Sequence, residues 1–553
     1  MIPHTVNKNS LLRNLKNLKI TYKHNEKRFL INGVKTQPSN NEKRQSGISL
    51  PNKDLEITFS VDRNTFLLKA LQKAQAQTRE ESTPKKIVID FSSPNIAKPF
   101  HAGHLRSTII GNFIANANKY FNNKVTKLNY LGDWGTQFGL LQYGLQAKSI
   151  DVAQLQENPI KTLYDVYVYA NKLSKTDETV QIEARKYFSD IEQGKTSLQN
   201  WKTIRETTIR ELDKVYQRLG IHFDTFDWES DYNGEAIKDL MISLEQKDII
   251  KRDESGKKVV TVNSRHVTIL KSDNSTLYLS RDIAALLDRY KRFEFDKMLY
   301  VVDNAQTDHF ATLFNIVSKL NEKCIVACEH IKFGRIKGMS TRQGNVVFLN
   351  DILDEAKRKM HEKQSISKNT RNSAQNDETC DILGTTAVVI NDLKQKRLKE
   401  YMFDWDRALQ SEGDTGIKLQ YLHCRLWSLE RNSGASLPDI CDPSYLPEEI
   451  IGDVVAEISK FDYNLHRSLE EYEACILVGY LFRLAKYVNR MFNELQVKNV
   501  EPDLAAQRLL VFHSARLVVK TGLEVLGVKL KIIIGRVIHV CIFYADTSKY
   551  YKK

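Results

Sequence analysis

The sequence has few of the cysteines that build disulfide scaffolds and none of the long apolar runs that cross membranes. Its 553 residues include seven cysteines, with no Cys-x-x-Cys pair and no cysteine or histidine cluster near Cys324 and Cys328. These counts exclude a disulfide scaffold, argue against a zinc site and fit a reducing compartment. The best candidate for a membrane span, residues 532–545, is shorter than the ~20 residues required and contains Arg536 and His539.

Acidic residues are absent from the first 23 positions. The same stretch contains five basic residues, Lys8, Arg13, Lys16, Lys19 and Lys23. Leu11, Leu15 and Leu18 fall on one face of a helix, so the sequence predicts a basic amphipathic helix here. Such a segment resembles a mitochondrial presequence, which we place within residues 1–25, and it equally fits the folded start of a domain.

The charge balance is strongly basic. Lysine and arginine total 82 against 68 aspartates and glutamates, which gives a net charge of +14. A surplus of this size is typical of proteins that bind a polyanion such as nucleic acid, although solvated surface lysines produce it as well. The length predicts two to four domains, and 41% hydrophobic with 27% charged residues indicates a soluble globular protein.

The hydrophobic pattern changes along the chain. Leu55–Val61 alternates as a strand does, and a helix is expected over 63–77, so residues 1–83 predict a small α+β domain that ends before Pro84. Beyond residue 405 leucines recur at helical spacing, which predicts an all-α bundle.

Residues 84–131 carry the pattern of a βαβ unit. Ile87–Phe91 is an apolar strand, Ser92–Asn95 breaks it, a helix begins near Gly103, and Val125–Leu131 is the next strand. This order predicts a doubly wound parallel sheet, with the 93–104 loop in the crevice where such sheets bind ligands. Further strands are expected at 298–303 and 346–349, and helices mainly over 155–250.

His101-Ala102-Gly103-His104 lies at the start of the first helix of this unit. The glycine permits close approach of a nucleotide, the helix N-terminus favours phosphate charge, and the imidazoles can donate hydrogen bonds to phosphate oxygens. Two histidines in a loop are by themselves more often only solvent-exposed. A small basic loop, Lys337–Gly344, follows far downstream.

Together these two elements resemble the HIGH and KMSKS signatures of class I aminoacyl-tRNA synthetases. Longer motifs resemble the arginyl-tRNA synthetases in particular, over about residues 55–527: Phe91–Asn112, Leu131–Gly139, Tyr278–Asp282, Gly338–Gly344 and Gly413–Gly416. The resemblance implies a Rossmann-type α/β catalytic domain with a helical insertion at 84–405. It also implies a small N-terminal α+β domain at 1–83 and an all-α anticodon-binding (DALR-type) bundle at 406–553.

The resemblance assigns roles to individual residues. Those expected to bind L-arginine are Ser93, Pro94, Asn95, His104, Glu229, Tyr278, Asp282 and Gln306. Of these, Tyr278, Asp282 and Glu229 would contact the side chain, and carboxylates suit a planar guanidinium. Tyr278 and Asp282 are four apart and can share one helical face. Trp228 replaces a glycine of most relatives, which weakens the assignment of Glu229. Taken singly, Asp282 also fits a helix-capping acid, Tyr278 a core residue and Gln306 a surface residue.

The nucleotide side of the site is implied in the same way. Residues expected at ATP are His101, Gly103, His104, Met339 and Ser340, with His101, His104, Lys98, Ser340 and Arg342 as the catalytic set. Thr341 stands where the general signature has its second lysine, and Lys98 matches the lysine thought to replace it. A solvated surface lysine is the alternative interpretation of Lys98.

In the helical region, Lys418, Gln420, Tyr421 and Arg425 form a basic and aromatic mix suited to tRNA. The leucines between them, and Tyr421 itself, are equally explained by bundle packing. The run at 529–553 departs from the family's usual end, and we hypothesise that it is dispensable for catalysis and harmful to solubility.

The implied activity is arginine–tRNA ligation, with ATP as substrate, Mg²⁺ accompanying ATP, no resident metal, and L-arginine and tRNA(Arg) as partners. A monomer without membrane association is expected, in the mitochondrial matrix or alternatively in the cytoplasm. Two rivals are a non-catalytic RNA-binding paralogue and a class I-like adenylyltransferase without a tRNA partner.

Overall fold

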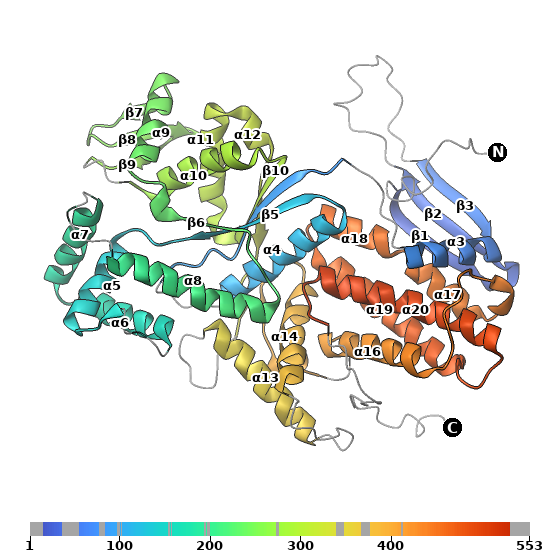
Figure 1. Cartoon of the computed structure of the whole chain (residues 1–553). Helices are drawn as coiled ribbons and strands as arrows, with labels where there is room; N and C mark the ends of the chain where they lie inside the picture. Colours follow the sequence, from blue (N-terminus) through green and yellow to red (C-terminus); the bar gives the residue numbers. More distant parts are fainter. Residues whose placement is uncertain are drawn as a thin grey trace, which may run out of the picture. The chain divides into compact units, whose positions relative to one another are not determined.

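The computed structural model describes residues 15–35, 55–76, 83–96, 100, 102–152, 155, 158–192, 195, 199–272, 276–338, 348–366, 377–410 and 413–530 (Figure 1). The chain forms two compact units. One contains 82–356 and 397–405, and the other contains 1–81, 357–396 and 406–553.

The first unit, which we call the sheet unit, is built on five parallel strands in the order β11-β10-β4-β5-β6. Their bounds are β4 Lys86–Asp90, β5 Lys124–Leu131, β6 Thr225–Trp228, β10 Lys297–Asp303 and β11 Cys328–Phe333. β4, the first of these five strands in sequence, lies in the centre of the sheet, so the chain order reverses between β4 and β10. A ligand crevice is expected at this switch point, beyond the carboxyl ends of the strands.

Helices cover both faces of this sheet. Val88, Leu128 and Met298 face a core made with α9 (Glu235–Gln246), α10 (Tyr278–Phe293) and α11 (Thr307–Leu320). Ile89, on the opposite face, is also fully buried, and α4 (Ala102–Tyr120) packs against β4, β5 and β10. Burial on both faces explains why β4 and β10 contain continuous apolar runs, Ile87–Ile89 and Met298–Val302.

The remaining elements of the sheet unit surround this core. They are α5 Thr136–Ala147, α6 Pro159–Leu173, α7 Glu178–Glu192, α8 Gln199–Leu219, α12 Glu322–Val326, an antiparallel sheet of β7 Ile250–Arg252, β8 Lys258–Val262 and β9 Arg265–Leu270, and the parallel pair β12 Ile336–Lys337 and β13 Tyr401–Met402. The strands at 87–91, 125–131 and 298–303 and the helix near Gly103 are confirmed within one residue.

The strand predicted at 346–349 is wrong at its described end. Leu349 is fully buried and begins α13 (Leu349–Ile366). The backbone N–H of Phe348 donates to Asp351 Oδ2 at 3.1 Å, which satisfies one donor at the helix start. Apolar residues at this short spacing fit a strand and a buried helix start equally well.

The second unit, which we call the helical unit, joins the N-terminal sheet to the C-terminal helices. Antiparallel strands β1 Leu15–Lys23, β2 Arg28–Lys35 and β3 Leu55–Asp62 precede α3 (Arg63–Ala76), in agreement with the predicted strand and helix at 55–77. The helices that follow are α14 Asp377–Leu393, α16 Gly416–Asn432, α17 Glu449–Ile458, α18 Phe461–Glu470, α19 Ala474–Glu494 and α20 Pro502–Val525.

The predicted N-terminal helix is wrong from Leu15 onward. Residues 15–23 form β1, which pairs with β2 and buries Ile20 and Tyr22 on one face. Tyr22 packs so closely on α17 that a Cβ on Gly452 would lie 2.8 Å from its ring. Leu18, Ile20 and Tyr22 alternate with polar residues, and this period-two pattern, supported by pairing, outweighs the helical spacing of the leucines. Residues 1–14 lie outside the described part.

Candidate active site

The loop after β4 holds two consecutive serines in the left-handed region, with φ of 75° at Ser92 and 45° at Ser93. Side chains of neighbouring elements fix this conformation. The Ser92 N–H donates to Ser107 Oγ at 2.9 Å, and the Ser93 N–H donates to Asn129 Oδ1 at 3.0 Å. Such backbone strain persists only where surrounding contacts hold it, and it concentrates at functional sites. The loop is therefore a built feature at the switch point.

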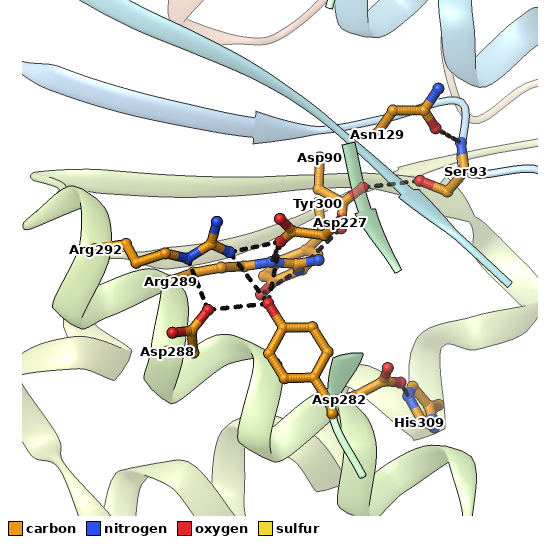
Figure 2. A network of polar contacts seen from close by, with 11 residues as sticks. Asp90, Ser93, Asn129, Asp227, Asp282, Asp288, Arg289, Arg292, Tyr300 and His309 are labelled. Carbon is orange, nitrogen blue, oxygen red and sulfur yellow. Dashed lines mark hydrogen bonds and ion pairs between the residues drawn. The ribbon is translucent and has the colours of Figure 1, made fainter. Parts of the chain in front are cut away.

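A network of buried charged side chains also holds this loop in place (Figure 2). Ser93 Oγ donates to Asp90 Oδ1 at 2.8 Å, and Arg289 Nη1 donates to Asp90 Oδ2 at 3.1 Å. Arg289 Nε also donates to Asp227 Oδ2 at 2.9 Å, and Arg292 donates to the same oxygen at 2.8 Å. Burial raises the pKa of Asp90, whereas the two guanidiniums outweigh burial at Asp227 and lower its pKa.

Helix α10 begins at Tyr278, and Ser280 Oγ accepts the Leu277 N–H at 3.0 Å as a cap for its first turn. The helix places Tyr278 and Asp282 one turn apart, as their spacing predicted. Tyr278 is 54% exposed, and Asp282 Oδ2 lies 2.7 Å from His309 Nε2 of α11. Figure 2 shows Asp282 and His309 facing each other. The contact with His309 was not visible in the sequence.

Glu229 follows β6 directly and is 5% exposed. Its Oε1 accepts hydrogen bonds from Arg281 Nε at 2.8 Å and Nη2 at 2.6 Å. Burial raises the pKa of Glu229 to about 7, and Arg281 opposes that rise. The partner that the structure gives to Glu229 is thus an arginine of the chain itself.

The unusual Trp228 has a specific partner. The Arg205 guanidinium lies 3.9 Å from the ring centre of Trp228 and 4.4 Å from that of Trp201. Asp133 is buried next to this stack, accepts hydrogen bonds from Ser230 N–H and Oγ, and has its pKa raised to about 6 by burial. Cation–π stacking of this kind contributes ~0.5–2 kcal/mol. Trp228 therefore fits beside Glu229 without displacing it.

One pocket joins several predicted residues. Asn95, Glu229 and Tyr278 line it together with Ile96, Gly132, Asp133, Trp134, Gln137, Phe138, Leu141 and Tyr167. Gly132 leaves room for the Asn95 side chain, since an added Cβ would lie 2.0 Å from Asn95 Oδ1 in its present position. The Leu131–Gly139 motif was recognised in the sequence, but none of its residues was given a role.

Gln306, Gly103 and His104 are described by the structure and are not among the residues that line this pocket. Gln306 is exposed at the end of the turn that follows β10. Gly103 and His104 lie in the first turn of α4, and the His104 ring stacks on Phe100 at 5.4 Å. A second cavity, which Pro94 lines, shares Asn95 with the first and extends along α8 to the start of α13. Lys98, His101, Met339, Ser340 and Arg342 lie outside the described residues.

The predicted tRNA contacts on α16 differ in accessibility. Gln420 is 1% exposed and donates to Thr386 Oγ1 at 3.0 Å and to the Lys529 carbonyl at 2.6 Å. A side chain buried in this way is a packing residue, so we withdraw it from the tRNA contacts. Lys418, Tyr421 and Arg425 are partly exposed, and the Arg425 guanidinium lies 3.9 Å from the Phe492 ring centre.

Among the described residues, no helix has the length and apolar character needed to cross a membrane, and no group of three His, Cys, Asp or Glu side chains is placed to hold a metal ion.

Comparisons with known proteins agree with this geometry. Residues 65–405 match the catalytic domain of the class I (R) tRNA synthetases, and residues 419–531 match the DALR anticodon binding domain. The probable mitochondrial arginine–tRNA ligase of Bos taurus is 38% identical over 450 residues, 80% of this chain and 78% of the relative. The cytoplasmic arginine–tRNA ligase of Saccharomyces cerevisiae is also 38% identical, over 80% of this chain and 76% of the relative.

The fold is shared with solved structures. The arginyl-tRNA synthetase of Thermus thermophilus superimposes with a TM-score of 0.73 at 19% identity, over 91% of this chain and 96% of that one. The parallel sheet with a pocket beyond the carboxyl ends of β4, β5 and β6, the two domain matches and the extent of the curated relatives lead to one conclusion. The chain belongs to the class I arginyl-tRNA synthetases.

Proposed function

We propose that the protein is an arginine–tRNA ligase. The carboxylate of L-arginine attacks the α-phosphate of ATP, which gives arginyl-adenylate and releases pyrophosphate. A hydroxyl of the terminal ribose of tRNA(Arg) then attacks the arginyl carbonyl and releases AMP. The observation that carries the proposal is the meeting of Asn95, Glu229 and Tyr278 in one pocket at the carboxyl edge of the sheet, with Asp282 one helical turn from Tyr278.

The chain's part in this reaction is binding and positioning. Glu229 and Asp282 hold the guanidinium, and the Ser93–Asn95 loop and Gln306 hold the α-amino and carboxylate end. His104, in the first turn of α4, lies where phosphate charge is favoured by the helix N-terminus. Mg²⁺ is expected to arrive with ATP, whose phosphate oxygens it binds.

The experiment is aminoacylation of tRNA with each of the common amino acids in turn. Arginine alone should be attached, and only when ATP is present. A protein that binds tRNA but attaches no amino acid would be the RNA-binding paralogue. A protein that adenylylates a substrate without requiring tRNA would be the adenylyltransferase.

We further propose that Lys98 compensates for Thr341 by stabilising charge on the ATP phosphates. Lys98→Ala should then lower the rate of charging more than it weakens arginine binding, because the contact develops in the transition state. Arg342→Ala is the matched comparison and should have the smaller effect. The reverse ranking would assign the function to the basic loop instead.

We propose mitochondrial matrix as the location. Mitochondrial and cytoplasmic relatives are equally similar to this chain, so their identities do not discriminate the two compartments. The proposal is supported instead by the acid-free, basic N-terminus. Because β1 begins at Leu15 and packs in the helical unit, a removable leader must end before this strand rather than at residue 25. Imaging of the full chain against a chain that begins at Leu15 tests this. The full chain should enter mitochondria and the shorter one should remain in the cytosol; equal distribution would contradict the proposal.

A further inference from the structure

Arg281 is fixed at the site by contacts on three sides. Its Nε and Nη2 both donate to Glu229 Oε1, its Nη1 donates to Thr276 Oγ1 at 2.6 Å, and its guanidinium carbon lies 5.0 Å from the Tyr278 ring centre. Arg281 is 4% exposed. A guanidinium held in this manner is not a mobile surface cation, and its position is determined by the start of α10 and the strand-like segment before it.

The two oxygens of Glu229 have different environments. Oε1 takes both hydrogen bonds from Arg281, whereas Oε2 accepts none within the part of the chain that the structure describes. Oε2 lies on the side of Gly132, where an added Cβ would be 3.5 Å from it. Gly132, Asn95 and Glu229 line the same pocket, so the unused oxygen is the one turned toward the space for a ligand.

The charges around Glu229 would oppose its ionisation if Arg281 were absent. Burial raises its pKa, and Asp282 from α10 and Asp133 from the loop after β5 raise it further. The Tyr130 hydroxyl on β5 and the Tyr278 hydroxyl on α10 also lie within electrostatic range and remain neutral because their own pKa values are raised. Arg281 is the cation that opposes this group of acids.

We propose that Arg281 is a positioning residue that favours the ionised form of Glu229 and directs its Oε2 toward the guanidinium of the substrate arginine. The inference deepens the proposed function and rests on it. With L-arginine bound, the guanidiniums of Arg281 and of the substrate would balance the carboxylates of Glu229 and Asp282. Arg281 would keep Oε1 of Glu229, and the substrate would bind Oε2. Without Arg281, a protonated Glu229 would be a poor partner for a cation.

The test is equilibrium binding of L-arginine to the full chain by calorimetry between about pH 6 and pH 9. Arg281→Gln should bind L-arginine at least about fivefold more weakly near pH 7, because Glu229 would fall from about half to about one tenth ionised if its pKa rose by about one unit from its value of about 7. The deficit should shrink as pH rises, because Glu229 then ionises without help. Arg281→Lys should recover part of the affinity, and Lys291→Gln, an exposed site on the same helix, is the matched control and should bind as the wild type does.

Several outcomes would overturn the inference. Unchanged affinity in Arg281→Gln would remove Arg281 from the site, and a deficit that is equal at every pH, with no recovery in Arg281→Lys, would indicate a packing role only. Wild-type protein that binds L-arginine while Arg281→Gln binds equally well refutes this inference alone. Wild-type protein that neither binds L-arginine nor charges tRNA with it refutes the proposed function and the inference together. Thermal unfolding of each variant identifies a loss that comes from misfolding, and Arg281→Lys keeps the test valid in that case.

Discussion

The two ends of helix α10 use the same side-chain chemistry for opposite purposes. Toward its C-terminus, Arg289 is 1% exposed and connects Asp90 of β4 to Asp227 of β6. Asp90 uses both of its oxygens, one for Arg289 and one for Ser93. In the first turn, Arg281 engages only one oxygen of Glu229 and leaves the other turned toward a pocket.

This difference distinguishes a buried ion pair that stabilises the fold from one that is arranged to bind a ligand. Burying a charge is costly unless partners compensate, so a carboxylate with both oxygens engaged belongs to the scaffold. A carboxylate with one oxygen held and one directed at a cavity is pre-organised for a cation from outside. The following variants test this distinction, beginning with the largest expected effect.

Removing Arg289, the central cation of the structural network, should lower the free energy of unfolding more than any other of these variants would. Arg289→Met leaves Asp90 and Asp227 buried without their main partner, so unfolding free energy should fall by ~3–5 kcal/mol. Arg292→Met is the comparison on the same helix; its side chain is 37% exposed, and it should cost no more than ~1 kcal/mol. Denaturant unfolding measures both. Equal losses would show that burial of Arg289 does not set its importance.

A methyl group at the pocket wall should have an intermediate effect. In Gly132→Ala the new Cβ would overlap Asn95 Oδ1, so the Asn95 side chain must move away from the pocket wall, at a cost of ~1 kcal/mol, the low end for overpacking. We expect this as weakened L-arginine binding in calorimetry. Gly479→Ala, whose added Cβ has no contact closer than 3.9 Å, is the control and should bind normally. Normal binding by Gly132→Ala would remove this wall from the site.

Shortening the chain should have the smallest effect. Gln420 donates to the Lys529 carbonyl and Val528 is buried, so the chain should end at Leu530 rather than at Val528 as the sequence alone suggested. This variant should charge tRNA as the full chain does and remain soluble at higher concentration, with unfolding changed by less than ~0.5 kcal/mol. Lost activity or precipitation would show that the residues after 530 belong to the functional protein.

The sequence predicted the central elements well because their signals are local. Local sequence determines β4, the Ser92–Asn95 loop that ends it, and α4. Their signals are apolar runs and helix-start residues that lie within a few positions of one another. The shared face of Tyr278 and Asp282 follows directly from helical spacing. The prediction of Tyr278 and Glu229 at one pocket depended on family resemblance, because nothing in either local sequence marks it.

Contacts between distant residues could not be predicted. Arg281 and Glu229 are 52 positions apart, and Asp282 and His309 are 27 apart, so no periodicity connects them. Gln420 looked like an RNA contact by its residue type, but packing against α14 buries it. At β1, the helical spacing of leucines competed with a strand pattern, and pairing with β2 decided the outcome. In each case tertiary contacts, which the sequence does not display, set the role.

The most direct measurement compares L-arginine binding by Asp282→Asn and Asp288→Asn, two aspartates on the same helix. Asp288 pairs with Arg292 and Tyr232 in the structural network, whereas Asp282 contacts only His309 among the described residues. Asp282→Asn should weaken binding by ~2–5 kcal/mol, as removal of a charge from a buried guanidinium contact does. Asp288→Asn should bind within ~0.5 kcal/mol of the wild type. Equal affinities in the two variants, or a greater loss in Asp288→Asn, would contradict the assignment of the first turn of α10 to the arginine site.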